Sequence, residues 1–127
     1  MLSKFYTFLK SGGSILFDIP SLKAFAKREE TTVYEVNLMN NFWSPRKYYG
    51  FLHTFKYDKE KVILDKYTII EANRTRIFYT WLQYFSREMI ENELKTHGFS
   101  INDFFSDVAG SVCDSESEVF AIVAGKA

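Results

Sequence analysis

Residues 8–20 read FLKSGGSILFDIP, and this stretch decides the fold of the chain. Before it, apolar residues recur every three or four positions over residues 2–9, which is the spacing of one helix face. The sequence therefore predicts a helix over residues 2–9, ended by Gly12 and Gly13 as a left-handed cap. The apolar run at residues 15–19 predicts a short strand covered on both faces.

Composition predicts one globular domain over residues 1–127, because 46% of the residues are hydrophobic and 25% are charged. The 16 basic and 16 acidic residues leave no net charge, so a nucleic-acid partner is not expected. Cys113 is the only cysteine, which excludes an internal disulfide and fits a reducing compartment. No apolar run approaches the roughly 20 residues of a spanning helix, and residues near Met1 lack a secretory apolar region. We expect a cytoplasmic protein with no membrane partner.

The middle of the chain changes to a period of two, which is the spacing of strands with two distinct faces. Short polar segments at residues 58–60 and 72–74 are typical of turns. The pattern predicts an antiparallel meander of three to four strands, rich in aromatic residues, with both faces in contact with protein or ligand. The predicted strands are residues 31–38, 47–57, 61–71 and 75–85.

The sequence predicts a second helix after the meander. Ser86 is a predicted N-cap for a helix that runs to about Thr96. Gly98 follows the helix end, and Phe99 is placed to contact Leu94, as in a Schellman ending. The last predicted elements are strands at residues 101–108 and 119–124, with a turn at residues 110–117. The whole pattern favours an α+β fold with about two to three helices.

The order of these elements resembles the C-terminal half of class I S-adenosylmethionine-dependent methyltransferases. The segments that carry the resemblance are LKSGG at residues 9–13, HGF at 97–99, DVAG at 107–110 and FAIVAGK at 120–126. The resemblance implies a partial α/β fold, with a mixed sheet taken from the C-terminal half of a Rossmann-like enzyme.

Within this resemblance, residues 1–20 and 86–127 correspond to the methyltransferase core, and residues 31–85 to an antiparallel lid that binds the methyl acceptor. The Gly-rich cofactor loop of the family has no counterpart here, so no cofactor-binding residue is assigned. S-adenosylmethionine is implied only for the intact family. The chain alone is expected to be an inactive, truncated part of such an enzyme. The strand at residues 15–19 would then expose one edge, and we expect a homo-oligomer, a dimer, to hide it.

The resemblance and the aromatic content together give a set of candidate acceptor-binding residues. Aromatic faces bind planar or cationic groups, and Asp18 closes a strand at the sheet edge where this fold places ligands. The candidates are Asp18, Tyr34, Phe42, Trp43, Tyr49, His53, Tyr79 and Trp81. Each aromatic residue has an alternative role in the core, and Asp18 an alternative role as a helix cap.

Candidates for chemistry are few. His53 is the one base within an aromatic row, and it could take a proton from an acceptor, although a structural role in the sheet is the commoner one. His97 is interpreted as a helix C-terminal residue, and Cys113 as structural. No metal site is predicted, because His, Cys, Asp and Glu do not occur at close ligand spacing.

Two other functions fit the same sequence. One is a small α+β module that binds an aromatic or lipid-like ligand on an aromatic-lined sheet without catalysis. The other is an oligomeric scaffold that recruits a second chain by strand addition at a sheet edge.

Overall fold

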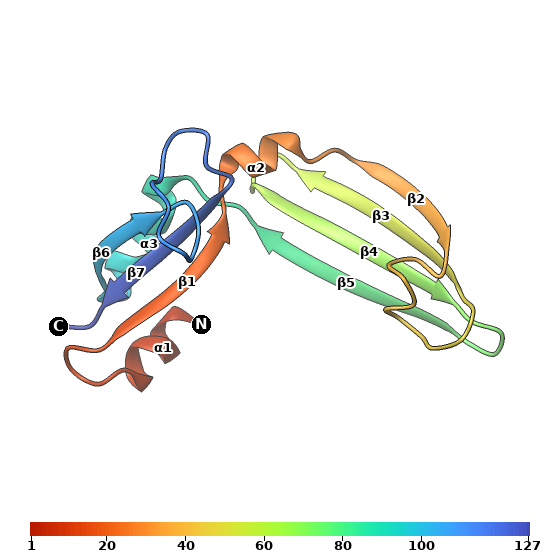
Figure 1. Ribbon diagram of the computed structural model, residues 1–127, viewed down its shortest axis with the longest axis horizontal. Coiled ribbons are helices and arrows are strands. Elements are labelled where there is room, and N and C mark those ends of the chain that lie inside the picture. Colours follow the sequence, from red (N-terminus) through yellow and green to blue (C-terminus); the bar gives the residue numbers. More distant parts are fainter. The chain divides into compact units, whose positions relative to one another are not determined.

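The structure is a computed structural model that describes residues 1–127 (Figure 1). The chain divides into two compact units, one formed by Met1–Lys27 with Tyr84–Ala127 and the other by Arg28–Gln83. With three helices, a three-stranded sheet and a four-stranded sheet, it confirms the α+β class. The elements are α1 (Leu2–Phe8), β1 (Ser14–Pro20), α2 (Leu22–Lys27), β2 (Thr31–Val36), β3 (Tyr49–Tyr57), β4 (Val62–Ile70), β5 (Thr75–Gln83), α3 (Arg87–Thr96), β6 (Ser100–Phe105) and β7 (Val119–Gly125).

The first unit is built on a sheet with the strand order β1-β7-β6. Both pairings are antiparallel, with Phe17 of β1 opposite Ile122 of β7. The prediction that residues 15–19 lie beside the closing strands is therefore confirmed. β1 and β6 are the two edge strands, and one parallel bridge joins Ser21, just after β1, to Phe85.

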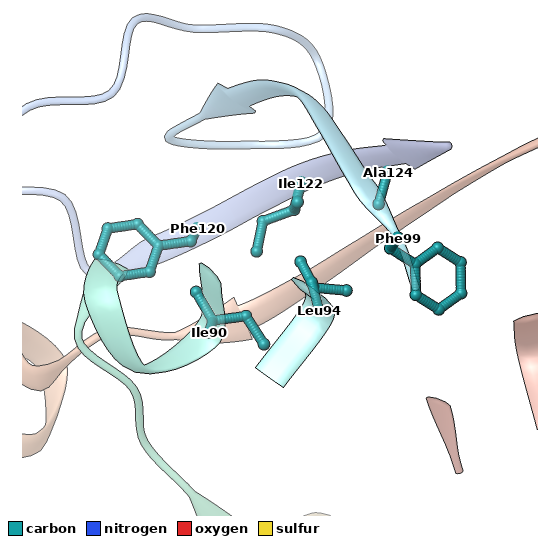
Figure 2. Close-up of a cluster of buried hydrophobic side chains, with 6 residues drawn as sticks. All are labelled: Ile90, Leu94, Phe99, Phe120, Ile122 and Ala124. Atoms are coloured by element: carbon teal, nitrogen blue, oxygen red, sulfur yellow. The ribbon is translucent and has the colours of Figure 1, made fainter. Parts of the chain in front are cut away.

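Two helices cover the same face of this sheet. Ile90 and Leu94 of α3 point toward Phe120 and Ile122 of β7, and Phe99 and Ala124 complete the buried cluster (Figure 2). Of the four apolar positions predicted for the first helix face, Leu2 and Tyr6 of α1 and its cap residue Leu9 pack against that cluster, whereas Phe5 is exposed. The helical spacing of the sequence thus marks the core side of both helices.

Both ends of α3 follow the predicted capping pattern. The Ser86 hydroxyl accepts a hydrogen bond from the Met89 amide at 3.1 Å. At the other end Gly98 has φ +88°, the Gly98 amide donates to Lys95 O and the Phe99 amide donates to Leu94 O, both at 3.0 Å. This is the Schellman ending, and it is fixed by local sequence alone.

Two predictions for the N-terminal stretch are wrong, and the first concerns the end of the helix. α1 ends at Phe8, and its cap residue Leu9 is extended, so the glycines do not cap the helix. Gly12 instead has φ +77° in a separate turn, in which the Gly13 amide donates to Lys10 O at 2.9 Å.

The strand at residues 15–19 is covered on one face only, because α1 and α3 pack on the same side of the sheet. On the other side Leu16 is 55% exposed and Asp18 is exposed as well. Asp18 was the one sign in this stretch of a difference between the two faces.

The second unit is an antiparallel meander with the strand order β2-β3-β4-β5, as predicted. β2 ends at Val36, earlier than predicted, because the chain turns at Asn37, Met39, Asn40 and Asn41, which all have positive φ. Asparagine tolerates this conformation better than most residues do.

The turn after β2 brings Leu38 against the sheet. Leu38 is 5% exposed, and a Cβ added to Gly50 would lie 2.5 Å from the Leu38 Cβ. Only glycine allows this approach. The loop between β2 and β3 lies at one end of the meander (Figure 1).

One face of this sheet is therefore covered by its own loop. Leu38, Tyr48 and Ile69 form its buried cluster, against which Trp43, Leu52, Tyr67 and Phe78 pack. We expected both faces to meet protein or ligand, and for this face the protein is the chain itself.

Candidate functional site

The opposite face of the four-stranded sheet is exposed and aromatic. Strand register places alternate side chains of β2, β3, β4 and β5 together there, including most of the predicted acceptor-binding residues. We call this surface the aromatic face. Its aromatic and imidazole side chains are those of Tyr34, Tyr49, Phe51, His53, Phe55, Tyr57, Tyr79 and Trp81.

The aromatic side chains gather toward two corners of this face. Near the end of β2, the Tyr34 ring lies 5.0 Å from Phe51 and 6.3 Å from Tyr49, between centroids. Toward the opposite end of the strands, the Tyr57 and Trp81 rings lie 5.9 Å apart. Trp81 is 61% exposed and Tyr34 is 54% exposed, so both corners offer ring surface to a ligand.

A polar row crosses the sheet between the two corners. Thr32 lies opposite His53, His53 opposite Lys66, and Lys66 opposite Tyr79, each on a neighbouring strand. Directly opposed side chains on one face of a sheet are close neighbours. His53 is exposed and its ring stacks on Phe55 at 4.2 Å, so this possible base is open to a ligand.

Lys66 and Thr32 were not predicted as members of this row. Their place depends on the strand register, which the sequence of one strand does not contain. The only available signal was the alternation that puts Lys66 on the same face of β4 as Leu64 and Thr68.

Trp43 and Phe42 lie away from the aromatic face. The Trp43 ring stacks on Phe78 at 4.7 Å and meets Tyr67 at 4.9 Å, and both partners belong to the covered face. The Trp43 Nε1–H is buried and has no hydrogen-bond partner. Phe42 is 68% exposed and places its ring edge-on to Trp43 at 4.9 Å.

Asp18 belongs to the first unit. It is exposed on β1, opposite Ala121 of β7. The same unit holds a cavity of about 550 Å³ between α3, β6 and the loop that carries Cys113, with Arg87 and Asp103 in its lining.

The three side chains whose pKa values are shifted have structural surroundings away from the aromatic face. Burial, and then the charge of Asp65, raise the pKa of the Tyr67 hydroxyl on the covered face. In the turn after β4, a hydrogen bond from the Arg74 side chain is the main cause of the lowered pKa of Glu71. A hydrogen bond from the Ser111 hydroxyl is the main cause of the lowered pKa of Asp107. These side chains lie off the aromatic face, so their shifts carry no catalytic argument.

The chain does not fit a nucleoside cofactor at its paired glycines. The Gly12 amide donates to Lys126 O and the Gly13 amide donates to Lys10 O, both at 2.9 Å, so neither is free to bind a ligand. A strand begins after them, whereas the family loop opens a helix. No group of three or more His, Cys, Asp or Glu side chains could hold a metal ion. None of the three helices has the length and apolar character to cross a membrane.

The fold is that of part of an S-adenosylmethionine-dependent methyltransferase. Among solved structures, an S-adenosylmethionine-dependent methyltransferase from Clostridium acetobutylicum matches 98% of this chain with 49% of its own length, at a TM-score of 0.69 and 14% identity. The CcbJ methyltransferase from Streptomyces caelestis matches 99% of this chain with 51% of its own length, at a TM-score of 0.68 and 12% identity. DesVI from Streptomyces venezuelae matches with a TM-score of 0.50 and 13% identity, over 99% of this chain and 49% of its own.

The chain thus spans about half the length of the solved structures that it matches. At such low identity the likeness is one of fold. No family model matches the sequence, and no curated protein matches it.

Proposed function

We propose that this chain is the acceptor-binding part of an S-adenosylmethionine-dependent methyltransferase, and that it transfers no methyl group by itself. The shared fold over nearly the whole chain carries the proposal, because the matched enzymes use about twice the length. The hydrogen-bonded amides of Gly12 and Gly13 support the second part, since they leave no cradle for the cofactor.

The aromatic face is the proposed acceptor surface. Methyl transfer depends mainly on holding an acceptor in line with the methyl group, so a rigid sheet with exposed rings suits this task. Tyr34, Tyr49, Tyr79 and Trp81 would contact the body of the acceptor. His53 is the group in the polar row that could act as a base toward the acceptor.

The other candidates receive different roles in this proposal. Trp43 and Phe42 hold the loop between β2 and β3 on the covered face, where Trp43 stacks on Phe78. Asp18 lies on β1, the strand with a free edge, so we assign it to the boundary with a cofactor-binding segment.

That segment would pair with the free edge of β1. Unpaired backbone groups on an edge strand are a template for another strand. Without the segment, we expect the edge to be hidden by self-association, as a dimer.

Reconstitution tests the proposal. The chain would be mixed with a separately expressed cofactor-binding segment encoded by the same genome, and cofactor binding followed by calorimetry. We expect binding in the mixture and none with the chain alone. Leu16→Glu should abolish it, because Leu16 is exposed on β1, whereas Val112→Glu, at an 85% exposed position in a loop, should not. Tight cofactor binding by the chain alone would contradict the proposal.

A second candidate function is a ligand-binding module without catalysis. The exposure of the aromatic face favours it, since this surface is complete within residues 28–83. A stable monomer whose melting temperature rises with an apolar ligand, with no gain on mixing with any cofactor-binding segment, would decide for the module. A scaffold role by strand addition at β1 would instead give complexes insensitive to such ligands.

A further inference from the structure

Lys66 is the one charged residue that the paired strands place within the aromatic face, whereas Lys47, just before β3, lies at its border with the ammonium 5.6 Å from the Tyr49 ring centroid. It lies in the middle of the polar row, and its side chain is half-buried. None of the ion pairs in the structure includes it. The centre of the face therefore carries a positive charge with no carboxylate beside it.

On the covered face, by contrast, two carboxylates are paired with arginines. There Arg28 pairs with Asp65 at 2.9 Å, and Arg76 pairs with Glu71 at 3.0 Å. No Asp or Glu occurs among the residues of β2, β3, β4 and β5 that alternate onto the aromatic face. Glu71, in the turn after β4, is already engaged by Arg74 and Arg76.

A half-buried ammonium group loses part of its hydration, and only a hydrogen-bonding or charged partner compensates for that loss. Its neighbours in register, His53 and Tyr79, can donate or accept hydrogen bonds but bring no negative charge. The charge of the face is therefore complementary to an anion.

The geometry points to a small anionic molecule with a planar apolar body as the occupant of this face; the inference rests on the proposed function, whose acceptor it describes. The anionic group pairs with Lys66, and the body stacks on Trp81 and Tyr57 at one corner. Trp81 lies two residues along β5 from Tyr79, which is opposite Lys66, and this spacing of about 7 Å is one that a fused two-ring body can span.

The test compares three ligands of one shape on the whole chain by calorimetry. 2-Naphthoate should bind about threefold to fivefold tighter than neutral 2-naphthamide, and 2-naphthylmethylammonium should bind weakest. In Lys66→Gln the preference for the anion should fall to about one, while 2-naphthamide affinity stays unchanged. The matched control is Lys59→Gln, in the exposed turn between β3 and β4, which should keep the preference.

A second measurement locates the ligand. The His53 ring resonances should shift when 2-naphthoate binds and should not shift in the Trp81→Ala, Tyr57→Ala double variant. Far-ultraviolet circular dichroism confirms that each variant is folded.

Equal binding of the anionic and neutral ligands, no binding of either, or a preference that survives Lys66→Gln would overturn the inference. So would a stable dimer that Trp81→Ala converts to monomer, because a second copy would then occupy the face. The proposed function fails separately: anion binding without reconstituted cofactor binding would refute methyl transfer and leave this site standing.

Discussion

At the scale of the residue, Trp43 shows how a conspicuous side chain can belong to the framework. It lies in a loop, and such a tryptophan is readily interpreted as a ligand contact. In the structure its ring is stacked between loop and sheet, and its indole N–H has no partner. A buried N–H without a partner is destabilising, and the packing of the ring offsets this cost.

This role predicts opposite outcomes for two substitutions. Trp43→Ala should lower the free energy of unfolding by about 3 kcal/mol, because it empties the space above Tyr67 and Phe78. Trp43→Phe should change it by less than about 1 kcal/mol, since the ring remains and the unpaired donor is removed. Urea unfolding measures both. The anion preference of the aromatic face should survive in Trp43→Phe, and its loss would mean that Trp43 touches the ligand.

Glu71 makes the stability of the second unit depend on pH. Its side chain is 9% exposed, and hydrogen bonding by Arg74 holds the pKa of the carboxyl below its usual value of 4.5. A lowered pKa in the folded state adds stability that is complete above pH 4.5 and is lost as the pH falls through the folded-state pKa. Glu71→Gln should therefore be less stable than the parent at about pH 6, and the difference should shrink as the pH falls below 4.5. Glu35, on exposed β2, is in none of the ion pairs, so Glu35→Gln serves as the control and should not reproduce this loss of stability.

At the scale of the element, α3 was the best predicted part of the chain. Its start at Ser86 and its end at Gly98 are set by hydrogen bonds within a few residues, so local sequence contains them. The exposed face of β1 and the position of Lys66 were not predictable in this way. They depend on which side α1 and α3 cover and on how β3, β4 and β5 are aligned, and both are properties of distant segments. Trp43 was misleading for the same reason, because only the folded loop shows that it packs against β4 and β5.

The C-terminal cap of α3 gives a direct test of this local control. Gly98→Ala should lower the free energy of unfolding by about 1–2 kcal/mol, because a left-handed residue with a Cβ is strained. The added Cβ would also lie 3.0 Å from the Tyr6 ring. Asn92→Ala, in the exposed middle of the same helix, should be neutral or slightly stabilising, since alanine is the better helix former. Thermal unfolding of the pair checks the prediction, and equal melting temperatures would argue against it.

At the scale of the whole molecule, the sheet of the first unit has two edge strands, β1 and β6, each with one isolated bridge near one end. β1 also has exposed Leu16 and Asp18 on its uncovered side. A free strand edge beside apolar surface favours association with another chain.

Self-association is what we expect of the exposed β1 edge. The chain should form a concentration-dependent dimer in sedimentation equilibrium, and Leu16→Glu should shift it toward monomer by placing a charge beside the β1 edge. Val112→Glu adds the same charge at a more exposed site in the loop between β6 and β7 and should leave the dimer intact. Because both positions are exposed, neither change should alter stability by more than about 0.5 kcal/mol, which separates lost association from lost folding. A monomer at all concentrations, or equal effects of the two substitutions, would remove β1 as the association edge and leave the aromatic face as the remaining large apolar surface.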